Sequence, residues 1–274
     1  MGKVITAADI ANYLDLRDDF DLELFAYREL LEHGWVAHHG GAYTDPYTEK
    51  PRQYDIAARK EFSYKRDVYL AVECKGLSAE NPLIVSRVPR ADASHDLLKL
   101  WLRPQIGDAY FTVERYSGKG MALYPPGGMV GKSTTQIRWT DGDKRLAASD
   151  AETYDKWSQA LTAAASLLDA AILHAPEPNP RLTFVMPVLV VSDNTLWAVD
   201  YAEDGKRAAP MPVEEVVLYV DRKRQMQNRN EKVTYRFLHL HIYTRKGFVE
   251  MLNNISSPTG LLLERIFGWA LRVG

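Results

Sequence analysis

Apolar residues recur at helical spacing in two stretches of the chain. The first, residues 19–34, opens with acidic side chains and ends at Gly34, which suit the two ends of a helix. The second and longer stretch, residues 150–174, follows Ser149 and contains Glu152, a pair that forms a capping box. Its apolar stripe is Trp157, Leu161, Ala164, Leu168 and Ile172. The spacing predicts one helix in each stretch.

Between these helices several short stretches are typical of strands, either alternating between apolar and polar residues or apolar throughout. We expect strands in "WVAHHGGAY", breaking at Gly40-Gly41, and in "QYDIAARKEF", "YLAVECKGL" and "NPLIVSRV". Residues 90–148 are mixed, with a short helix expected at "DLLKLWL" and strands at "AYFTVERY" and "QIRW" around Gly/Pro-rich loops.

After the long helix, "TFVMPVLVV" and "TLWAVDY" predict two strands that Asp193-Asn194 joins as a hairpin. The segments "EVVLYV" and "YRFLHLHIYT" predict a second hairpin with a long basic tip, and two helices then close the chain.

Composition narrows the class of protein. The 274 residues are 46% hydrophobic and 26% charged, which is ordinary for a globular protein with a sizeable core. No stretch approaches the apolar length of a membrane span, and the N-terminus lacks the pattern of a secretory signal. The single cysteine suits a reducing compartment. We therefore expect a cytoplasmic protein that does not associate with a membrane.

Charge is unevenly distributed although the net charge is only −2. Residues 222–246 contain eight Lys or Arg and one acid, so this segment carries +7 and the remaining residues −9. A basic segment of this kind suits a polyanion. The candidate nucleic-acid contacts here are Arg222, Lys223, Arg224 and Arg229. A solvated hairpin tip is the other interpretation that the residues leave open.

The stretch "YLAVECKGL" places two opposite charges at the end of an expected strand. Glu73 and Lys75 share one face and Cys74 lies on the other, at the carboxyl end where α/β sheets open their clefts. The residues allow a surface ion pair of little energetic value, charges paired across strands, or half of a metal-dependent active site.

The order of elements resembles that of the PD-(D/E)XK nuclease superfamily, the restriction-endonuclease-like fold. A helix with Glu23 precedes a strand, a strand with Asp55, a strand with Glu73-Cys74-Lys75, a helix and a strand. The resemblance spans residues 20–200, and its motifs lie in residues 20–90. It implies an α/β fold with an αβββαβ core and a mixed sheet flanked by helices. We expect that core in residues 1–205, with a C-terminal hairpin and helices, residues 206–274, packed on it.

The resemblance also implies a metal site. In this family, residues matching Asp55, Glu73 and the backbone carbonyl of Cys74 bind Mg²⁺, for which Mn²⁺ substitutes, and the lysine matching Lys75 orients the attacking water. Glu23, eleven residues before Gly34, matches a helix glutamate that some members place near the metal. The motif proline is missing, because Tyr54 precedes Asp55. Hard oxygen ligands suit Mg²⁺, and the cation offsets the repulsion between nearby carboxylates.

One further motif is incomplete. In "PGGMVGKSTT", Pro126 stands where a phosphate-binding loop of the Walker type needs its first glycine, so we do not expect an NTPase. A Gly-rich loop with Lys132 and Ser133 could still contact nucleic-acid phosphates.

Together these features predict a Mg²⁺-dependent nuclease that prefers DNA and serves in defence, restriction or repair. A homodimer or a partner protein is expected, because cutting both strands of a duplex usually takes two sites. The alternative is a catalytically inactive module with the nuclease fold that binds nucleic acid or a protein.

Overall fold

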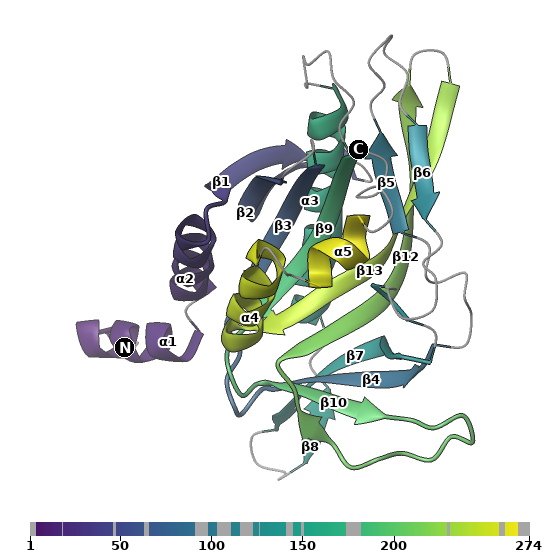
Figure 1. Cartoon of the computed structure of the whole chain (residues 1–274). Coiled ribbons are helices and arrows are strands. Elements are labelled where there is room, and N and C mark those ends of the chain that lie inside the picture. The colour runs from purple at the N-terminus through teal and green to yellow at the C-terminus, as the bar shows by residue number, and fades with distance from the viewer. Residues whose placement is uncertain are drawn as a thin grey trace.

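A large mixed β-sheet with helices on its faces forms the body of the protein in the computed structural model (Figure 1). The structure describes residues 4–17, 19–45, 48–62, 66–90, 98–102, 111–115, 123–125, 127–140, 145–148, 151–173, 182–228, 231–257 and 261–267. The main path of the sheet has the order β1-β2-β3-β9-β13-β12-β7-β4-β10-β11. The chain is therefore of the α/β class.

The described part of the chain forms five helices and thirteen strands. The helices are α1 (Ala7–Arg17), α2 (Asp19–Glu32), α3 (Ala151–Leu173), α4 (Arg245–Ser256) and α5 (Leu261–Phe267). The strands of the first half are β1 (Val36–Thr44), β2 (Pro51–Phe62), β3 (Arg66–Lys75), β4 (Leu83–Pro89), β5 (Leu98–Leu102), β6 (Phe111–Arg115), β7 (Met129–Trp139) and β8 (Leu146–Ala148). Those of the second half are β9 (Leu182–Val191), β10 (Leu196–Asp200), β11 (Met211–Pro212), β12 (Glu215–Asn228) and β13 (Glu231–Thr244).

The first half of the sheet is an antiparallel meander followed by a crossover. Strands β1, β2 and β3 pair in sequence, and β9 then pairs parallel to β3. Parallel neighbours need a connection that returns the chain to the same end of the sheet, and α3 lies within that connection. The helices predicted for residues 19–34 and 150–174 are confirmed as α2 and α3.

The two faces of β3 are covered by different helices. Leu70, Val72 and Cys74 pack in one cluster with residues of α2, α4 and α5. Ala71 points the other way and packs with Ala163 and other residues of α3. A strand covered on both sides must be apolar on both sides, and this accounts for the nearly continuous apolar run of β3.

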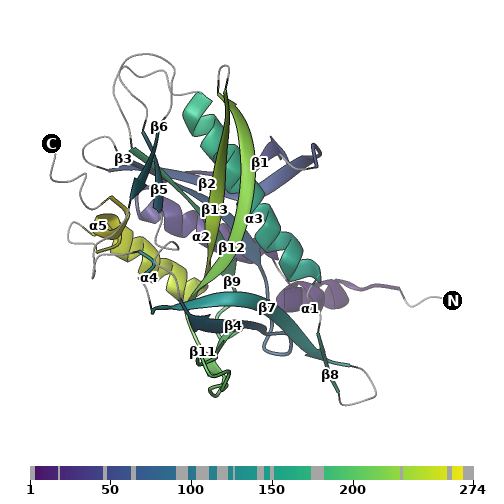
Figure 2. The same cartoon turned by 90° about the vertical axis from the view of Figure 1, so that its right-hand side faces the viewer.

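The second half of the sheet is joined to the first by the long β12–β13 hairpin. Figure 2 shows this hairpin rising between α3 and the α4–α5 pair. β13 pairs with β9, and β12 pairs with β7. The predicted hairpin is confirmed, but its long basic tip is wrong, because the strands stay paired as far as Asn228 and Glu231 and so include most of the basic segment. Residues 215–244 therefore supply two strands in the middle of the sheet.

Two predicted elements differ from the structure. β1 does not break at Gly40-Gly41 but continues along β2, and a side chain at Gly41 would collide with the Tyr54 ring. The helix predicted at "DLLKLWL" is wrong, because Leu98–Leu102 is the strand β5, which pairs with β6 and β9. Ser149, the predicted helix cap, lies outside the described residues.

The predicted hairpin at Asp193-Asn194 is also wrong. The chain does turn there, with Asn194 in the left-handed region at a φ of 62°. However, β9 is already paired on both edges with β3 and β13, so β10 pairs with β4 instead.

Among the described helices, none has both the length and the apolar character that a bilayer crossing requires.

Candidate active site

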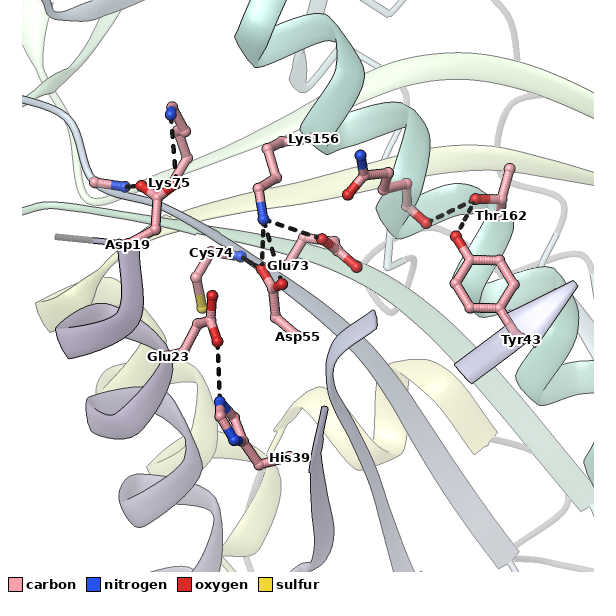
Figure 3. A network of polar contacts seen from close by, with 12 residues as sticks. Asp19, Glu23, His39, Tyr43, Asp55, Glu73, Cys74, Lys75, Lys156 and Thr162 are labelled. Carbon is pink, nitrogen blue, oxygen red and sulfur yellow. Dashed lines mark hydrogen bonds and ion pairs between the residues drawn. The ribbon is translucent and has the colours of Figure 1, made fainter. Parts of the chain in front are cut away.

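Asp55 and Glu73 lie side by side where β2 and β3 end their pairing. The last paired residues at this end are Ile56 and Val72, and Asp55 and Glu73 are the next residues on the two strands. Ile56 and Val72 face α2 and α4, so alternation turns Asp55 and Glu73 toward α3. Figure 3 shows the two carboxylates together beneath Lys156 of α3.

Asp55 is held by two donors. The backbone N–H of Cys74 donates to its Oδ2 at 2.8 Å. The Lys156 ammonium donates to Oδ2 at 2.9 Å and lies 3.3 Å from Oδ1. The Cys74 carbonyl belongs to the same strand residue as that N–H, and in a strand both groups of a residue face the same neighbouring strand. The carbonyl is therefore directed toward the side of Asp55.

Glu73 is buried and has few polar contacts. Its side chain is 0% exposed, and neither of its oxygens has a hydrogen-bond partner in the part of the chain that the structure describes. Lys156 Nζ lies 3.5 Å from Oε2. Burial raises the pKa of Glu73 well above its ordinary value, and the charge of Asp55 raises it further. Isolated buried carboxylates are costly, so this side chain calls for a cationic partner.

Glu23 reaches the same region from α2. Its Oε2 lies 2.9 Å from His39 Nε2, and the His39 ring packs beside Phe20. Burial raises the pKa of Glu23, and the charge of Asp55 adds to the effect. Burial raises the pKa of Cys74 well above its ordinary value, and the charges of Asp55, Glu23 and Glu73 raise it further. The structure thus brings together Glu23, Asp55, Glu73 and Cys74.

Lys75 does not contact the carboxylate pair. Its ammonium lies 3.4 Å from Asp19 Oδ2 at the start of α2, and Asp19 also accepts from the Gly76 N–H at 2.6 Å. The ammonium beside Asp55 and Glu73 belongs to Lys156 instead. Burial alone would lower the pKa of Lys156, but the charges of Asp55 and Glu73 raise it well above its ordinary value.

Lys156 is not among the site residues predicted from the sequence, although its spacing along α3 indicates a buried position. It lies four residues before Ala160 and seven before Ala163, and both alanines are buried beneath α3. A lysine at this helical spacing shares the buried face of its helix. A charge on that face requires a partner, and only the crossover geometry identifies Asp55 and Glu73 as that partner.

The carboxylates supply suitable donors for a divalent cation. Asp55, Glu73 and the Cys74 carbonyl are hard oxygen donors, and neither oxygen of Glu73 accepts a hydrogen bond from the described residues, so both fit a cation. Within the described ranges, however, no group of three or more His, Cys, Asp or Glu side chains is arranged to hold a metal ion. Lys156 Nζ lies between the two carboxylates. The residues therefore fit a divalent cation once this ammonium moves aside.

Of the basic candidates, Arg222 contacts α3. Its guanidinium lies over the Trp157 ring, 5.6 Å from the centroid, and donates to the Tyr154 hydroxyl at 3.1 Å. Both rings belong to the turns of α3 that carry Lys156. A register shift between Tyr219 and Arg222 marks a bulge in β12, a feature that redirects side chains.

The other basic candidates are placed differently. Lys132 and Ser133 lie in β7, so the predicted Gly-rich loop is wrong at these positions. Lys132 Nζ lies 4.3 Å from the Tyr219 ring centroid. Leu218 belongs to the same hydrophobic cluster as Ala160 of α3. Its neighbour Tyr219 therefore points to the face of the sheet away from α3, and so does Lys132, which lies over the Tyr219 ring. Lys223 and Arg224 are in β12, with side chains outside the described set, and Arg229 lies outside the described residues.

A separate cavity of about 250 Å³ lies between the β12–β13 hairpin and α4–α5. Its wall includes His241 and Tyr243, whose side chains are buried and contact each other at 3.1 Å. Burial lowers the pKa of His241 to about 4, so its ring is neutral at pH 7. None of Asp55, Glu73 and Lys156 lines this cavity.

Comparison with known proteins leaves the site to be interpreted from its own residues. No family model, no curated protein and no solved structure matches the chain.

Proposed function

We propose that this chain is a divalent-metal-dependent nuclease of the PD-(D/E)XK type, hydrolysing phosphodiester bonds in nucleic acid, with DNA preferred. One observation carries the proposal. Asp55 and Glu73 converge on one face of adjacent strands, and Glu73 is buried with no hydrogen-bond donor to either oxygen among the residues that the structure describes. Carboxylates in this setting are a common basis for a catalytic metal site.

The order of elements supports the same proposal. Apart from the five strands β4–β8 that are inserted between β3 and α3, the order α2-β1-β2-β3-α3-β9 is the αβββαβ succession expected of this superfamily. Its strands are neighbours in the order β1-β2-β3-β9, with β9 parallel to β3. In this arrangement the acid of the second strand and the acid of the third lie at one end of the sheet, beside the crossover helix.

In this proposal some residues hold the divalent cation and others stabilise the charge that develops on the phosphate. Asp55, Glu73 and the Cys74 carbonyl would hold Mg²⁺ or Mn²⁺, with Glu23 nearby. When bound, the cation would supply a Lewis acid for the phosphate and a template for water. The Cys74 N–H fixes the orientation of Asp55, and His39 fixes that of Glu23. These contacts limit the reorganisation that the reaction would require.

Two lysines are candidates for the charge-stabilising role. Lys75 has the position of the motif, but its ammonium is paired with Asp19. Lys156 is the lysine that contacts both carboxylates. After the cation has moved it aside, an ammonium next to the metal would stabilise the negative charge that develops on the phosphate and would hold a water molecule by hydrogen bonding. The geometry favours Lys156 over Lys75 for this role.

A second candidate function is a binding module with the same fold and no catalysis. The observation in its favour is that Lys156 already places a positive charge between Asp55 and Glu73. If that ammonium replaces the cation permanently, the chain would bind nucleic acid or a protein partner without cleaving anything.

A cleavage assay separates the two functions. Purified protein is incubated with linear, circular and single-stranded DNA and with RNA, in Mg²⁺ or Mn²⁺. We expect metal-dependent cleavage that falls by about a hundredfold or more in Asp55→Asn and Glu73→Gln, since each removes a charged oxygen ligand. Asp204→Asn is the matched control, because this exposed carboxylate pairs only with surface Lys206 in the contacts described. Cleavage that persists in Asp55→Asn contradicts the proposal, and metal-independent binding without cleavage favours the module.

A further inference from the structure

Lys156 occupies the position where Asp55 and Glu73 converge. Its Nζ lies 2.9 Å from Asp55 Oδ2 and 3.5 Å from Glu73 Oε2 (Figure 3). One ammonium therefore faces both carboxylates, as a bound cation would. We infer that Lys156 is the resident counter-ion of the Asp55–Glu73 pair and that a divalent cation must displace its ammonium in order to bind there. The inference rests on the proposed function, because it concerns the same metal site.

The carboxylates need a counter-ion even when no metal is bound. Glu73 is fully buried and Asp55 is its neighbour across the strands, so two acids share a region with little water. Carboxylates this close to each other repel when both are charged. Asp19 and Glu23 add negative charge around the same ammonium. Lys156 is the cation that contacts both Asp55 and Glu73 in the described part of the chain.

The ammonium is nevertheless able to leave. The Lys156 side chain is 20% exposed, so one side of it reaches solvent. Lysine carries its charge on a flexible four-carbon stem, and rotation of that stem moves the ammonium without moving α3. Lys156 lies near the start of α3, between Tyr154 and Trp157, and both of these side chains contact Arg222 of β12. A cation entering from the solvent side would thus exchange with the ammonium while the backbone stays in place.

Competition of this kind has a thermodynamic consequence. If the ammonium and the cation exclude each other, removing the ammonium must strengthen cation binding by the free energy with which Lys156 holds the site. If Lys156 remains beside a bound cation, its removal changes the affinity only through a charge at longer range. Lys75 supplies the comparison, because it carries the same charge near the same strand end but pairs with Asp19.

Mn²⁺ binding tests the inference without any substrate. Free Mn²⁺ is followed by electron paramagnetic resonance as the full chain is titrated, in the parent protein, Lys156→Met, Lys75→Met and Asp55→Asn. We expect Lys156→Met to lower the apparent Kd for Mn²⁺ by about tenfold or more, Lys75→Met to change it by less than about threefold, and Asp55→Asn to abolish binding. Equal changes in the two lysine variants, or weaker binding in Lys156→Met, overturn the inference.

Thermal unfolding provides a second readout and guards against a misfolded variant. Without metal, Lys156→Met should unfold at a lower temperature than the parent, because its buried carboxylates have lost their counter-ion. Saturating Mn²⁺ should raise the melting temperature of Lys156→Met by more than it raises that of the parent, because the variant binds the cation more tightly. An equal gain in both proteins contradicts displacement.

The outcomes distinguish this inference from the proposed function. Tighter Mn²⁺ binding in Lys156→Met, with no cleavage by any protein, supports the counter-ion role and contradicts the nuclease. Cleavage by the parent with unchanged Mn²⁺ affinity in Lys156→Met contradicts the counter-ion role alone. Absence of Mn²⁺ binding at millimolar concentration in the parent and in Lys156→Met contradicts both.

Discussion

At position 73 a carboxyl group lies fully buried between Asp55 and Lys156, and its charge depends on what faces it. Burial and the Asp55 charge favour the neutral form, and the Lys156 ammonium favours the carboxylate. The same residue that makes the site suitable for a cation therefore makes the metal-free protein sensitive to pH.

This sensitivity gives a prediction for Glu73→Gln. The pKa of Glu73 is raised in the folded protein above the ordinary value near 4.5, so in the pH range above 4.5 the folded state binds more protons than the unfolded state. The contribution of Glu73 to stability is thus complete below that ordinary value and is lost as pH rises through the folded-state pKa. Without metal, we expect the parent to lose stability relative to Glu73→Gln as pH rises from 4 to 8. Urea unfolding at several pH values measures the difference, and a constant difference contradicts the raised pKa.

Some of these residues are predictable from local sequence and others are not. Asp55, Glu73 and Cys74 lie on adjacent strands of a meander, so alternation and order suffice to place them on their faces. Lys156 is about eighty residues further along, and its contact depends on where α3 crosses the sheet. The pairing of Lys75 with Asp19 likewise depends on the angle at which α2 approaches the end of β3.

Among the elements, α3 determines where Lys156 stands. Ala160, Ala163 and Ala164 are each 0% exposed, and these small side chains allow the helix to lie close to the sheet. The sequence predicts the existence and length of this helix from its periodicity. It does not predict the partners of β9, because those partners come from β3 and from β13, which is far away in the sequence. The wrong β9–β10 hairpin has the same cause.

The close packing of α3 can be tested with one enlarged side chain. Ala163→Leu inserts extra carbon atoms between α3 and the sheet and should lower the free energy of unfolding by about 1–3 kcal/mol. It should also weaken Mn²⁺ binding by shifting α3 away from Asp55. Ala170→Leu is the matched control, because Ala170 is exposed on the same helix and should change stability by less than about 0.5 kcal/mol. Calorimetry and Mn²⁺ titration measure both effects, and equal behaviour of the two variants contradicts the packing argument.

On the scale of the whole molecule, charge is separated along the chain. Residues 222–246 carry +7 in a protein whose net charge is −2. This segment lies largely in the β12–β13 hairpin, and Arg222 at its start packs against α3 beside the carboxylate site. A polyanion attracted by the hairpin would therefore approach the side of the sheet that holds Asp55 and Glu73.

Salt dependence tests this approach of a polyanion. Arg222→Ala should weaken binding of a DNA duplex or single strand in EDTA and reduce the slope of log affinity against log salt by about 1, because one phosphate contact is lost. Lys206→Ala is the control, since Lys206 is 85% exposed and pairs with Asp204. Fluorescence anisotropy at several salt concentrations measures the slopes. An unchanged slope in Arg222→Ala would mean that Arg222 does not contact the DNA.

The position of the β12–β13 hairpin also matters while the chain is being made. β9 leaves the ribosome well before β13, its neighbour in the finished sheet, has been synthesised. Until then the nascent protein exposes an apolar strand edge, which is the kind of surface that captures other unfinished chains. Completion of the sheet therefore waits until residues 231–244 have been synthesised, and during that interval the edge of β9 is exposed to aggregation.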